Sequence, residues 1–283
     1  MKLLFAIKKL DDMPGGAERV LCILTSALAA RGHSVTLLSF DDGSGEPFYS
    51  LDERVRRIRL SIGDAARPAR LAETVARMRA LRRTIRAEAP DVVIGFTPSI
   101  YVPMAFALVG TGVPLVGSEH NVPDRYSSRR VQTLLTLMAA PLITRITVLS
   151  EQIRQNYPSA IARRMVPITN PVPPLADPPA PEAPRALRVL NVGRLVDQKD
   201  QATLLRAFAQ VAPRHPDWTL RIVGEGILRS ELQAMRTALG LQTSVEIPGA
   251  SRDIGQEYAG AAIFALSSLY ESFGLVTVEA MQH

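Results

Sequence analysis

The sequence predicts an α/β protein made of two Rossmann-like domains. Short apolar runs of strand length alternate with longer segments in which apolar residues recur every three or four positions, a pattern typical of parallel strands covered by helices. A proline-rich stretch interrupts this alternation once, and 283 residues are enough for about two ordinary domains. We therefore expect one domain over 1–169, a linker over 170–186 and a second domain over 187–283.

The first domain opens with a strand, a glycine pair and a helix. An apolar run over 2–7 precedes Gly15 and Gly16, which begin a helical pattern that Gly32 closes. Because glycine lets a ligand approach the backbone and a helix N-terminus attracts anions, both glycines are candidate substrate contacts. A tight turn would also explain the pair. No G-x-G-x-x-G motif follows, which disfavours a nicotinamide or flavin cofactor.

The next part of the domain combines strands with an arginine-rich helix. Strands are predicted over 33–40, 55–60 and 91–96, and a helix over 65–89. One stripe of this helix is apolar: Leu71, Val75, Met78, Leu81 and Ile85. The remaining surface carries seven arginines: Arg67, Arg70, Arg77, Arg79, Arg82, Arg83 and Arg86. Such a helix fits an anionic membrane surface, and solvated surface arginines explain it equally well.

A polar tetrapeptide follows the strand predicted over 113–117. Ligands of open α/β sheets bind at the carboxyl ends of the strands, so His120 and Asn121 are placed where a substrate would lie. A histidine after a strand is more often a hydrogen-bonded structural residue. A helix over 129–140 and a final strand over 143–149 complete the domain in this interpretation.

The second domain begins with a strand over 187–192 and a loop with two cations. Arg194 and Lys199 are five residues apart and precede a helix over 201–212, so both can point at one anion such as a diphosphate. Two unrelated surface cations beside a turn are the alternative. Further strands are predicted over 218–223, 245–248 and 261–266, and helices over 228–239 and 254–258.

The last stretch is a loop followed by an apolar helix. Free backbone N–H groups at such a junction suit a phosphate, here at Ser272, Phe273 and Gly274. Seven residues separate Glu271 from Glu279, just over two helical turns. Glu279 can therefore lie beneath the loop while Glu271 faces a pocket. The alternative is a pair of solvated acids.

The composition limits the partners. The net charge of +6 favours anionic ligands, and with aromatic residues at 5% and not interleaved with basic ones, nucleic acid is not predicted. The single cysteine, Cys22, rules out an intramolecular disulfide and fits the cytoplasm. No apolar run approaches the ~20 residues that cross a bilayer, so the protein is expected to be soluble or peripheral. No Asp-x-Asp motif occurs, and neither a metal nor a cofactor is predicted.

The stretch 267–281 resembles the E-x7-E motif of retaining GT-B glycosyltransferases, particularly glycosyltransferase family 4. The loop 193–200 is similar to the family's G-R-L-x-x-x-K pattern, and 223–226 is similar to its V-G-x-G turn. The resemblance implies two Rossmann-like domains facing across a cleft, with nucleotide sugar bound by the second. It implies transfer of a sugar from a nucleotide-sugar donor, with UDP as the expected nucleotide, to a hydroxyl of a lipid-linked or polysaccharide acceptor, with retention at the anomeric carbon.

The resemblance also implies roles for individual residues. Arg194 and Lys199 would hold the donor phosphates, with the amides at 272–274. Glu271 would bind the hydroxyls of the donor sugar, and Glu279 the ribose. His120 would lie at the donor sugar or on the acceptor side, with Asn121 beside it. Gly224 and Gly226 would lie near the base, and Gly15 and Gly16 near acceptor or phosphate.

The chain departs from the family pattern at its end. Family members continue for further strands and helices, so we expect a fragment or a truncated protein, with the strand over 261–266 at an exposed sheet edge. A catalytically inactive fragment that binds nucleotide sugar is therefore the alternative function. A nucleotide-sugar epimerase is a third, which the E-x7-E motif disfavours.

Overall fold

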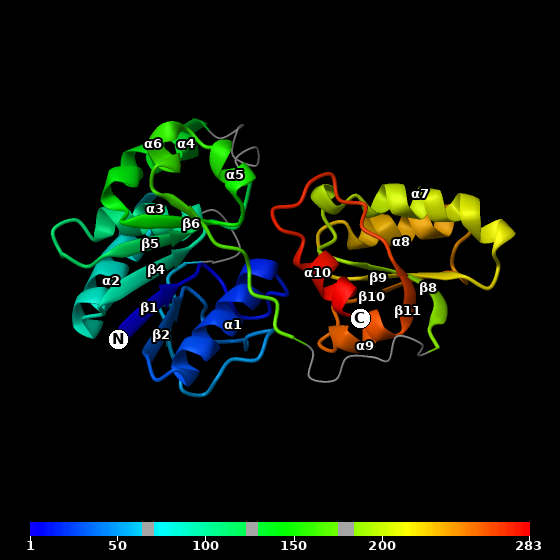
Figure 1. Cartoon of the computed structure of the whole chain (residues 1–283), viewed down its shortest axis with the longest axis horizontal. Coiled ribbons are helices and arrows are strands. Elements are labelled where there is room, and N and C mark those ends of the chain that lie inside the picture. Colours follow the sequence, from blue (N-terminus) through cyan, green and yellow to red (C-terminus); the bar gives the residue numbers. More distant parts are fainter. Residues whose placement is uncertain (64–70, 123–129, 175–183) are drawn as a thin grey trace. The chain divides into compact units, whose positions relative to one another are not determined.

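The computed structural model describes residues 1–63, 71–122, 130–174 and 184–283, and the chain folds as two compact α/β units. Unit 1 is Met1–Pro171 and unit 2 is Val172–His283, so the division falls inside the stretch predicted as a linker. Both sheets are parallel and covered by helices, as Figure 1 shows. Each unit is described by itself.

Unit 1 contains a seven-stranded parallel sheet in the order β3-β2-β1-β4-β5-β6-β7. Chain order reverses between β1 and β4, which places a topological switch point at the carboxyl ends of these strands. The strands are β1 Lys2–Ala6, β2 Ser34–Ser39, β3 Arg56–Arg59, β4 Val92–Phe96, β5 Leu115–Ser118, β6 Arg145–Val148 and β7 Met165–Pro167. The prediction that 143–149 is the final strand was wrong, because three residues ending in proline give too short a signal for β7.

The helices of unit 1 follow the predicted alternation with three omissions, the helices over 98–107, 151–155 and 159–162. They are α1 Gly16–Ala30, α2 Leu71–Glu88, α3 Pro98–Ala107, α4 Arg130–Ala139, α5 Glu151–Gln155 and α6 Ser159–Ala162. The sequence analysis missed α3 because it holds two prolines: Pro98 occupies the first turn, where no amide hydrogen bond is lost, and Pro103 lies inside. Gly32 ends α1 with a φ of 83°, as predicted.

The arginine face predicted for α2 is only partly present. Arg77 is buried: it pairs with Glu73 at 2.6 Å, donates to the carbonyl of Ile62 at 2.9 Å and lies over the ring of Phe40. Arg82 donates to the carbonyl of Val109. These two arginines hold the unit together, whereas Arg79, Arg83 and Arg86 are exposed. Arg67 and Arg70 lie outside the described residues.

Unit 2 contains a four-stranded parallel sheet in the order β10-β9-β8-β11. Its strands are β8 Ala186–Val192, β9 Thr219–Val223, β10 Val245–Gly249 and β11 Ala261–Phe264, and its helices are α7 Gln201–Val211, α8 Arg229–Ala238, α9 Ile254–Ala259 and α10 Leu275–Gln282. Figure 1 shows α7 and α8 over one face and α9 and α10 over the other. Separate apolar clusters fill the two faces, around Leu205 and around Tyr258.

The strand β11 is an edge strand, as expected from the sequence. The apolar sequence of this strand suggests burial on both faces, but Ile263 is 47% exposed. An edge strand lacks a neighbour on one side, so its side chains are less well covered than those of β8 in the centre of the sheet.

Candidate functional site

Three loops meet at the carboxyl ends of the strands of unit 2. They cover 193–200 after β8, 224–228 after β9 and 265–274 after β11. The first and second are joined by the amide of Leu195, which donates to the carbonyl of Glu225 at 2.9 Å. The first and third loops are joined by two hydrogen bonds. The amide of Leu269 donates to the carbonyl of Gln198, and the hydroxyl of Ser267 donates to the carbonyl of Lys199 at 2.8 Å. These bonds form one platform at the edge where parallel sheets bind ligands.

Two predicted glycines make this platform possible. A Cβ atom on Gly224 would lie 1.9 Å from the carbonyl oxygen of Gly193, and one on Gly226 would lie 2.2 Å from that of Leu195. Both contacts are with backbone atoms, which cannot swing aside. The structure therefore gives Gly224 and Gly226 a role in loop packing, whether or not a nucleotide base also lies against them.

Lys199 and Glu271 are brought together by the platform. The ammonium group of Lys199 forms a short ion pair with a carboxylate oxygen of Glu271, and the two side chains are 12% and 25% exposed. The aliphatic part of Lys199 lies over Gly193, where a Cβ atom would be 3.5 Å from Cδ. Arg194 is exposed in the same loop, and its carbonyl accepts a hydrogen bond from Gln201 at 3.0 Å. Asp200 closes the loop by capping α7 through the amide of Thr203.

The loop containing Ser272 and Phe273 leads into the N-terminus of α10. Both residues are half-buried, and Gly274 is the N-cap with a φ of 71°, a conformation that favours glycine. The N-terminus of α10 therefore lies at the end of the third loop, and helix N-termini attract anions.

Glu279 lies on the buried face of α10. It is 4% exposed, and its Oε2 atom accepts a hydrogen bond from the Tyr258 hydroxyl of α9 at 3.1 Å. The alternative of a solvated surface acid is thus wrong for Glu279. Sequence reasoning missed Tyr258, whose position in a six-residue helix gave no signal beyond an aromatic among polar residues.

In unit 1, His120 is held by a chain of hydroxyl groups. Thr147 donates to the Ser118 oxygen at 3.2 Å, and Ser118 lies 2.9 Å from Nε2 of His120. The imidazole stacks on Phe96 with ring centroids 4.9 Å apart. Because a hydroxyl group both donates and accepts, Ser118 can pair with either neutral tautomer of the imidazole. Burial lowers the pKa of His120 to about 4, so the ring is neutral near pH 7.

The glycine pair of unit 1 is covered by a carboxylate. A Cβ atom on Gly15 would lie 2.0 Å from Oε2 of Glu18, because the Glu18 side chain folds back over the start of α1. This is the place at which an anion satisfies helix N–H groups. A phosphate approaching Gly15 and Gly16 would have to displace Glu18, a group of the same charge.

Glu119 is a site residue that the sequence analysis did not single out. It is 1% exposed, and its carboxylate accepts hydrogen bonds from the Tyr101 hydroxyl at 2.8 Å and from the amide of Asn121 at 2.9 Å. Burial raises the pKa of Glu119 to about 7. Asn121, a predicted substrate contact, is thereby fixed through its backbone. The only signal in the sequence is that Glu119 directly precedes His120.

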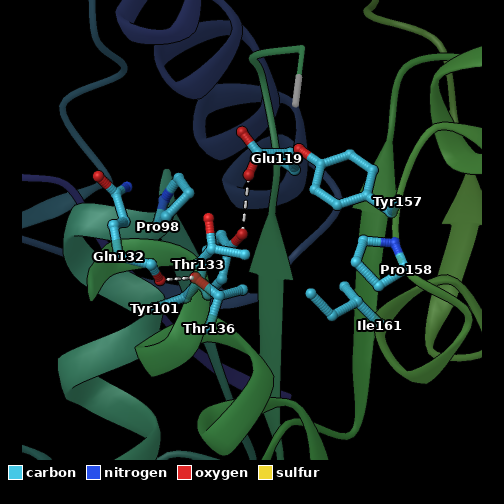
Figure 2. A pocket seen from close by; sticks show the side chains of 9 residues that line it. All are labelled: Pro98, Tyr101, Glu119, Gln132, Thr133, Thr136, Tyr157, Pro158 and Ile161. Atoms are coloured by element: carbon cyan, nitrogen blue, oxygen red, sulfur yellow. Dashed lines mark hydrogen bonds between the residues drawn. The ribbon is translucent and has the colours of Figure 1, made fainter. Parts of the chain in front are cut away.

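Glu119 forms one wall of a pocket at the carboxyl edge of the sheet (Figure 2). The pocket contains about 380 Å³ of empty space, part of which is open to solvent. Its other walls come from α3, α4 and the α5–α6 segment: Pro98, Tyr101, Gln132, Thr133, Thr136, Tyr157, Pro158 and Ile161.

Two units, each a parallel sheet covered by helices, define a protein of the two-domain α/β class. The model of "Glycosyltransferase Family 4" matches residues 14–174, and that of "Glycosyl transferases group 1" matches residues 178–283. The chain belongs to glycosyltransferase family 4. The predicted fold and family are confirmed.

Two characterised relatives and one solved structure illustrate the similarity. An exopolysaccharide phosphotransferase of Streptomyces coelicolor is 30% identical over 99% of this chain, which spans only 32% of that protein. The Campylobacter jejuni GalNAc-alpha-(1->4)-GalNAc-alpha-(1->3)-diNAcBac-PP-undecaprenol alpha-1,4-N-acetyl-D-galactosaminyltransferase is 27% identical over 99% of this chain and 77% of its own. The crystal structure of Anabaena HepE with UDP and glucose matches with a TM-score of 0.73, at 23% identity, over 100% of this chain and 78% of HepE.

Proposed function

We propose that this chain transfers a sugar from a UDP-linked donor to a hydroxyl of a lipid-linked or polysaccharide acceptor, with retention at the anomeric carbon. The observation that carries the proposal is the Lys199–Glu271 pair, held beside the N-terminus of α10 by three interlocked loops. The Campylobacter relative acts on a lipid-linked glycan by its name, and the HepE structure contains UDP. Unit 2 would bind the donor and unit 1 the acceptor.

In the proposed reaction, Lys199, Arg194 and the amides around 272–274 stabilise the negative charge that develops on the departing diphosphate. Breaking the bond between the anomeric carbon and the diphosphate oxygen leaves the electron pair on that oxygen. The acceptor oxygen forms the new bond and gives up its proton. Because Glu271 is held in an ion pair with Lys199, Glu271 suits hydroxyl binding, and we assign the acceptor proton to the departing diphosphate.

The remaining residues have supporting roles in this proposal. His120 forms a hydrogen bond with the donor sugar, with Asn121 beside it. Glu279 binds the ribose, and the backbone at Gly224 and Gly226 lies near the base. Gly15 and Gly16 serve the acceptor side. With two cations available for the diphosphate, the proposed reaction requires no metal ion.

The proposal is tested by incubating the chain with UDP-, GDP- and ADP-linked sugars and a lipid extract from bacterial membranes, with and without EDTA. Release of UDP, unchanged by EDTA, is the expected result. Release of UMP would indicate transfer of a sugar phosphate, an activity closer to the name of the Streptomyces relative. Calorimetric binding of UDP without turnover would favour the inactive nucleotide-sugar-binding protein, and loss of turnover in EDTA would contradict metal independence.

A peripheral membrane contact is also proposed, on α4 rather than on the arginine-rich α2. The outer face of α4 and the turn after it expose large apolar side chains at helical spacing: Val131, Leu134, Leu135, Met138 and Leu142. Between residues 130 and 170 the chain has five arginines and one acid, Glu151, which pairs with Arg154. An apolar face with a basic surround suits the surface of an anionic bilayer on the cytoplasmic side. Within the described ranges, no helix is long and apolar enough to cross a membrane.

Flotation with phosphatidylglycerol-containing vesicles at low salt tests the membrane contact. The wild-type chain is expected to float with the vesicles, and the Leu134→Ser/Met138→Ser variant to stay in solution, because two exposed apolar anchors are removed. Leu71→Ser is the matched control, since Leu71 is 82% exposed on α2. If the Leu71→Ser variant stays in solution and the α4 variant still floats, the membrane contact lies on α2 instead.

A further inference from the structure

Two buried amide side chains lie beneath the loops of unit 2. Asn191 belongs to β8 and Gln201 is the first residue of α7, and each is 1% exposed. Asparagine is depleted in strands and glutamine is mostly exposed in proteins, so apolar residues would be the ordinary choice at both positions. Burying an amide lowers stability unless the amide forms hydrogen bonds. The bonds that these two side chains form therefore indicate their role.

The Asn191 side chain fixes the start of the loop 265–274. The strands β8 and β11 pair as far as Leu190 and Phe264, and the amide of Ala265 still donates to the Leu190 carbonyl at 2.8 Å. The carbonyl of Ala265 accepts a hydrogen bond from Nδ2 of Asn191, also at 2.8 Å. Both backbone groups of Ala265 are thus held by consecutive residues of β8. This side chain therefore sets the point at which the loop carrying Glu271 leaves the sheet.

The Gln201 side chain fixes the loop 193–200 in a similar way. Its Nε2 atom donates to the carbonyl of Arg194 at 3.0 Å, which ties the beginning of the loop to the beginning of α7. Lys199 lies between these two tied points. A segment held at both ends has fewer conformations available than a free one, so the ammonium group of Lys199 is confined to one region.

Neither amide is the best choice for stability alone. Within the described residues, Oδ1 of Asn191 and Oε1 of Gln201 are buried without a hydrogen-bond partner. A buried oxygen that lacks a donor destabilises the fold. Leucine in place of Asn191, or methionine in place of Gln201, would remove that oxygen and would leave one loop carbonyl unpaired instead. The two effects nearly offset each other, so what the amides provide is the placement of the loops.

We propose that Asn191 and Gln201 are positioning residues of the donor site, which hold Glu271 and Lys199 in the arrangement that sugar transfer requires. The inference rests on the proposed glycosyltransferase function. Both side chains are too deeply buried to touch a substrate, so they act through the two loops. The ion pair between Lys199 and Glu271 forms where these anchored loops meet. A displacement of about 1 Å can reduce a rate by about 10²-fold, so the anchors are expected to affect turnover.

The test compares Asn191→Leu and Gln201→Met with the wild-type chain in the release of UDP from a UDP-sugar. Each substitution is expected to lower kcat by about tenfold or more, while KM for the donor rises less than about threefold. The groups that bind the donor remain, but they are no longer aligned with the reacting bond. The midpoint of urea denaturation should stay close to that of the wild type. Gln210→Met, the same substitution at an exposed position of α7, is the matched control and should leave kcat unchanged.

Double variants distinguish positioning from a general loss of structure. If Asn191 acts through Glu271, Asn191→Leu should lower kcat by less than about threefold in a Glu271→Gln background. Gln201→Met should likewise have little effect in a Lys199→Met background. Losses of the same size in both backgrounds, or wild-type kcat in the two single variants, would overturn the positioning role while the proposed function stands.

Hydrogen exchange tests the anchors without turnover. The amide of Leu269, which bonds the third loop to the first, should exchange about tenfold faster or more in Asn191→Leu. The amide of Leu195 should respond in the same way to Gln201→Met, whereas that of Leu220 in β9 should exchange as in the wild type. Unchanged exchange at both loop amides would refute the anchoring alone. Absence of turnover of every UDP-sugar by the wild-type chain would instead refute the proposed function, and the positioning role with it.

Discussion

Replacing Lys199 with methionine is expected to lower kcat/KM for turnover of the nucleotide sugar by about 10²–10³-fold, the usual cost of removing one group that stabilises transition-state charge. Methionine retains an apolar stem to lie over Gly193, so the loop packing is preserved. The charge that faces the diphosphate is lost, and Glu271 loses its partner. The measurement is the rate of UDP release at subsaturating donor, compared with wild type.

Arg206→Met is the matched control for this prediction. Arg206 is an exposed cation of α7 in the same unit, outside the three loops, and its loss should change the rate less than about twofold, since isolated surface charges contribute little. The Lys199→Met/Glu271→Gln double variant should be little slower than the slower single variant, because the two side chains act as a pair. Wild-type rates in Lys199→Met would remove Lys199 from the proposed mechanism.

The sequence was sufficient for the parts of unit 2 that depend on local pattern. A strand, a loop with Arg194 and Lys199, and a helix after that loop follow from residues that are close in the chain, and the structure has all of them. The contact between Lys199 and Glu271, 72 residues apart, could be expected only because both lie after strands whose carboxyl ends share one edge. For Gly224 the resemblance implied a nearby nucleotide base, and the close approach of the loop backbone at Gly193 was not foreseen.

Residues whose role depends on burial were not predictable in the same way. Nothing in the sequence distinguishes Arg77, which is buried against Phe40, from Arg79, which is exposed two positions later. Glu119 became a candidate only when Tyr101 was found within hydrogen-bonding distance, and Tyr101 lies in a helix concealed by its prolines. Charge and propensity describe a segment by itself, whereas the pKa of a carboxyl depends on what packs around it.

The Glu119→Gln variant is expected to change how the stability of the chain depends on pH. The pKa of Glu119 is raised from 4.5 to about 7 in the folded chain, so between these values the folded state holds a proton that the unfolded state has released. The contribution of Glu119 to the free energy of unfolding is therefore fully present below pH 4.5. It is lost as the pH rises through about 7, and the loss is on the order of 3 kcal/mol at most. Glutamine does not titrate, so this loss disappears in the variant.

The pKa shift of His120 changes the stability of the chain in the opposite direction over nearly the same pH range. Its pKa is lowered from 6.5 to about 4, so at intermediate pH the unfolded state binds the extra proton and stability rises with pH until 6.5. The two contributions should nearly cancel in the wild-type chain between pH 4.5 and 6.5. The free energy of unfolding of Glu119→Gln, relative to wild type, should then increase from pH 4.5 to about 7 and remain constant above, whereas that of His120→Gln should decrease from pH 4 to 6.5. Parallel profiles for wild type and Glu119→Gln in denaturant titrations would show that Glu119 is ionised in the folded chain at pH 5, and that its environment is wetter than the buried contact with Tyr101 implies.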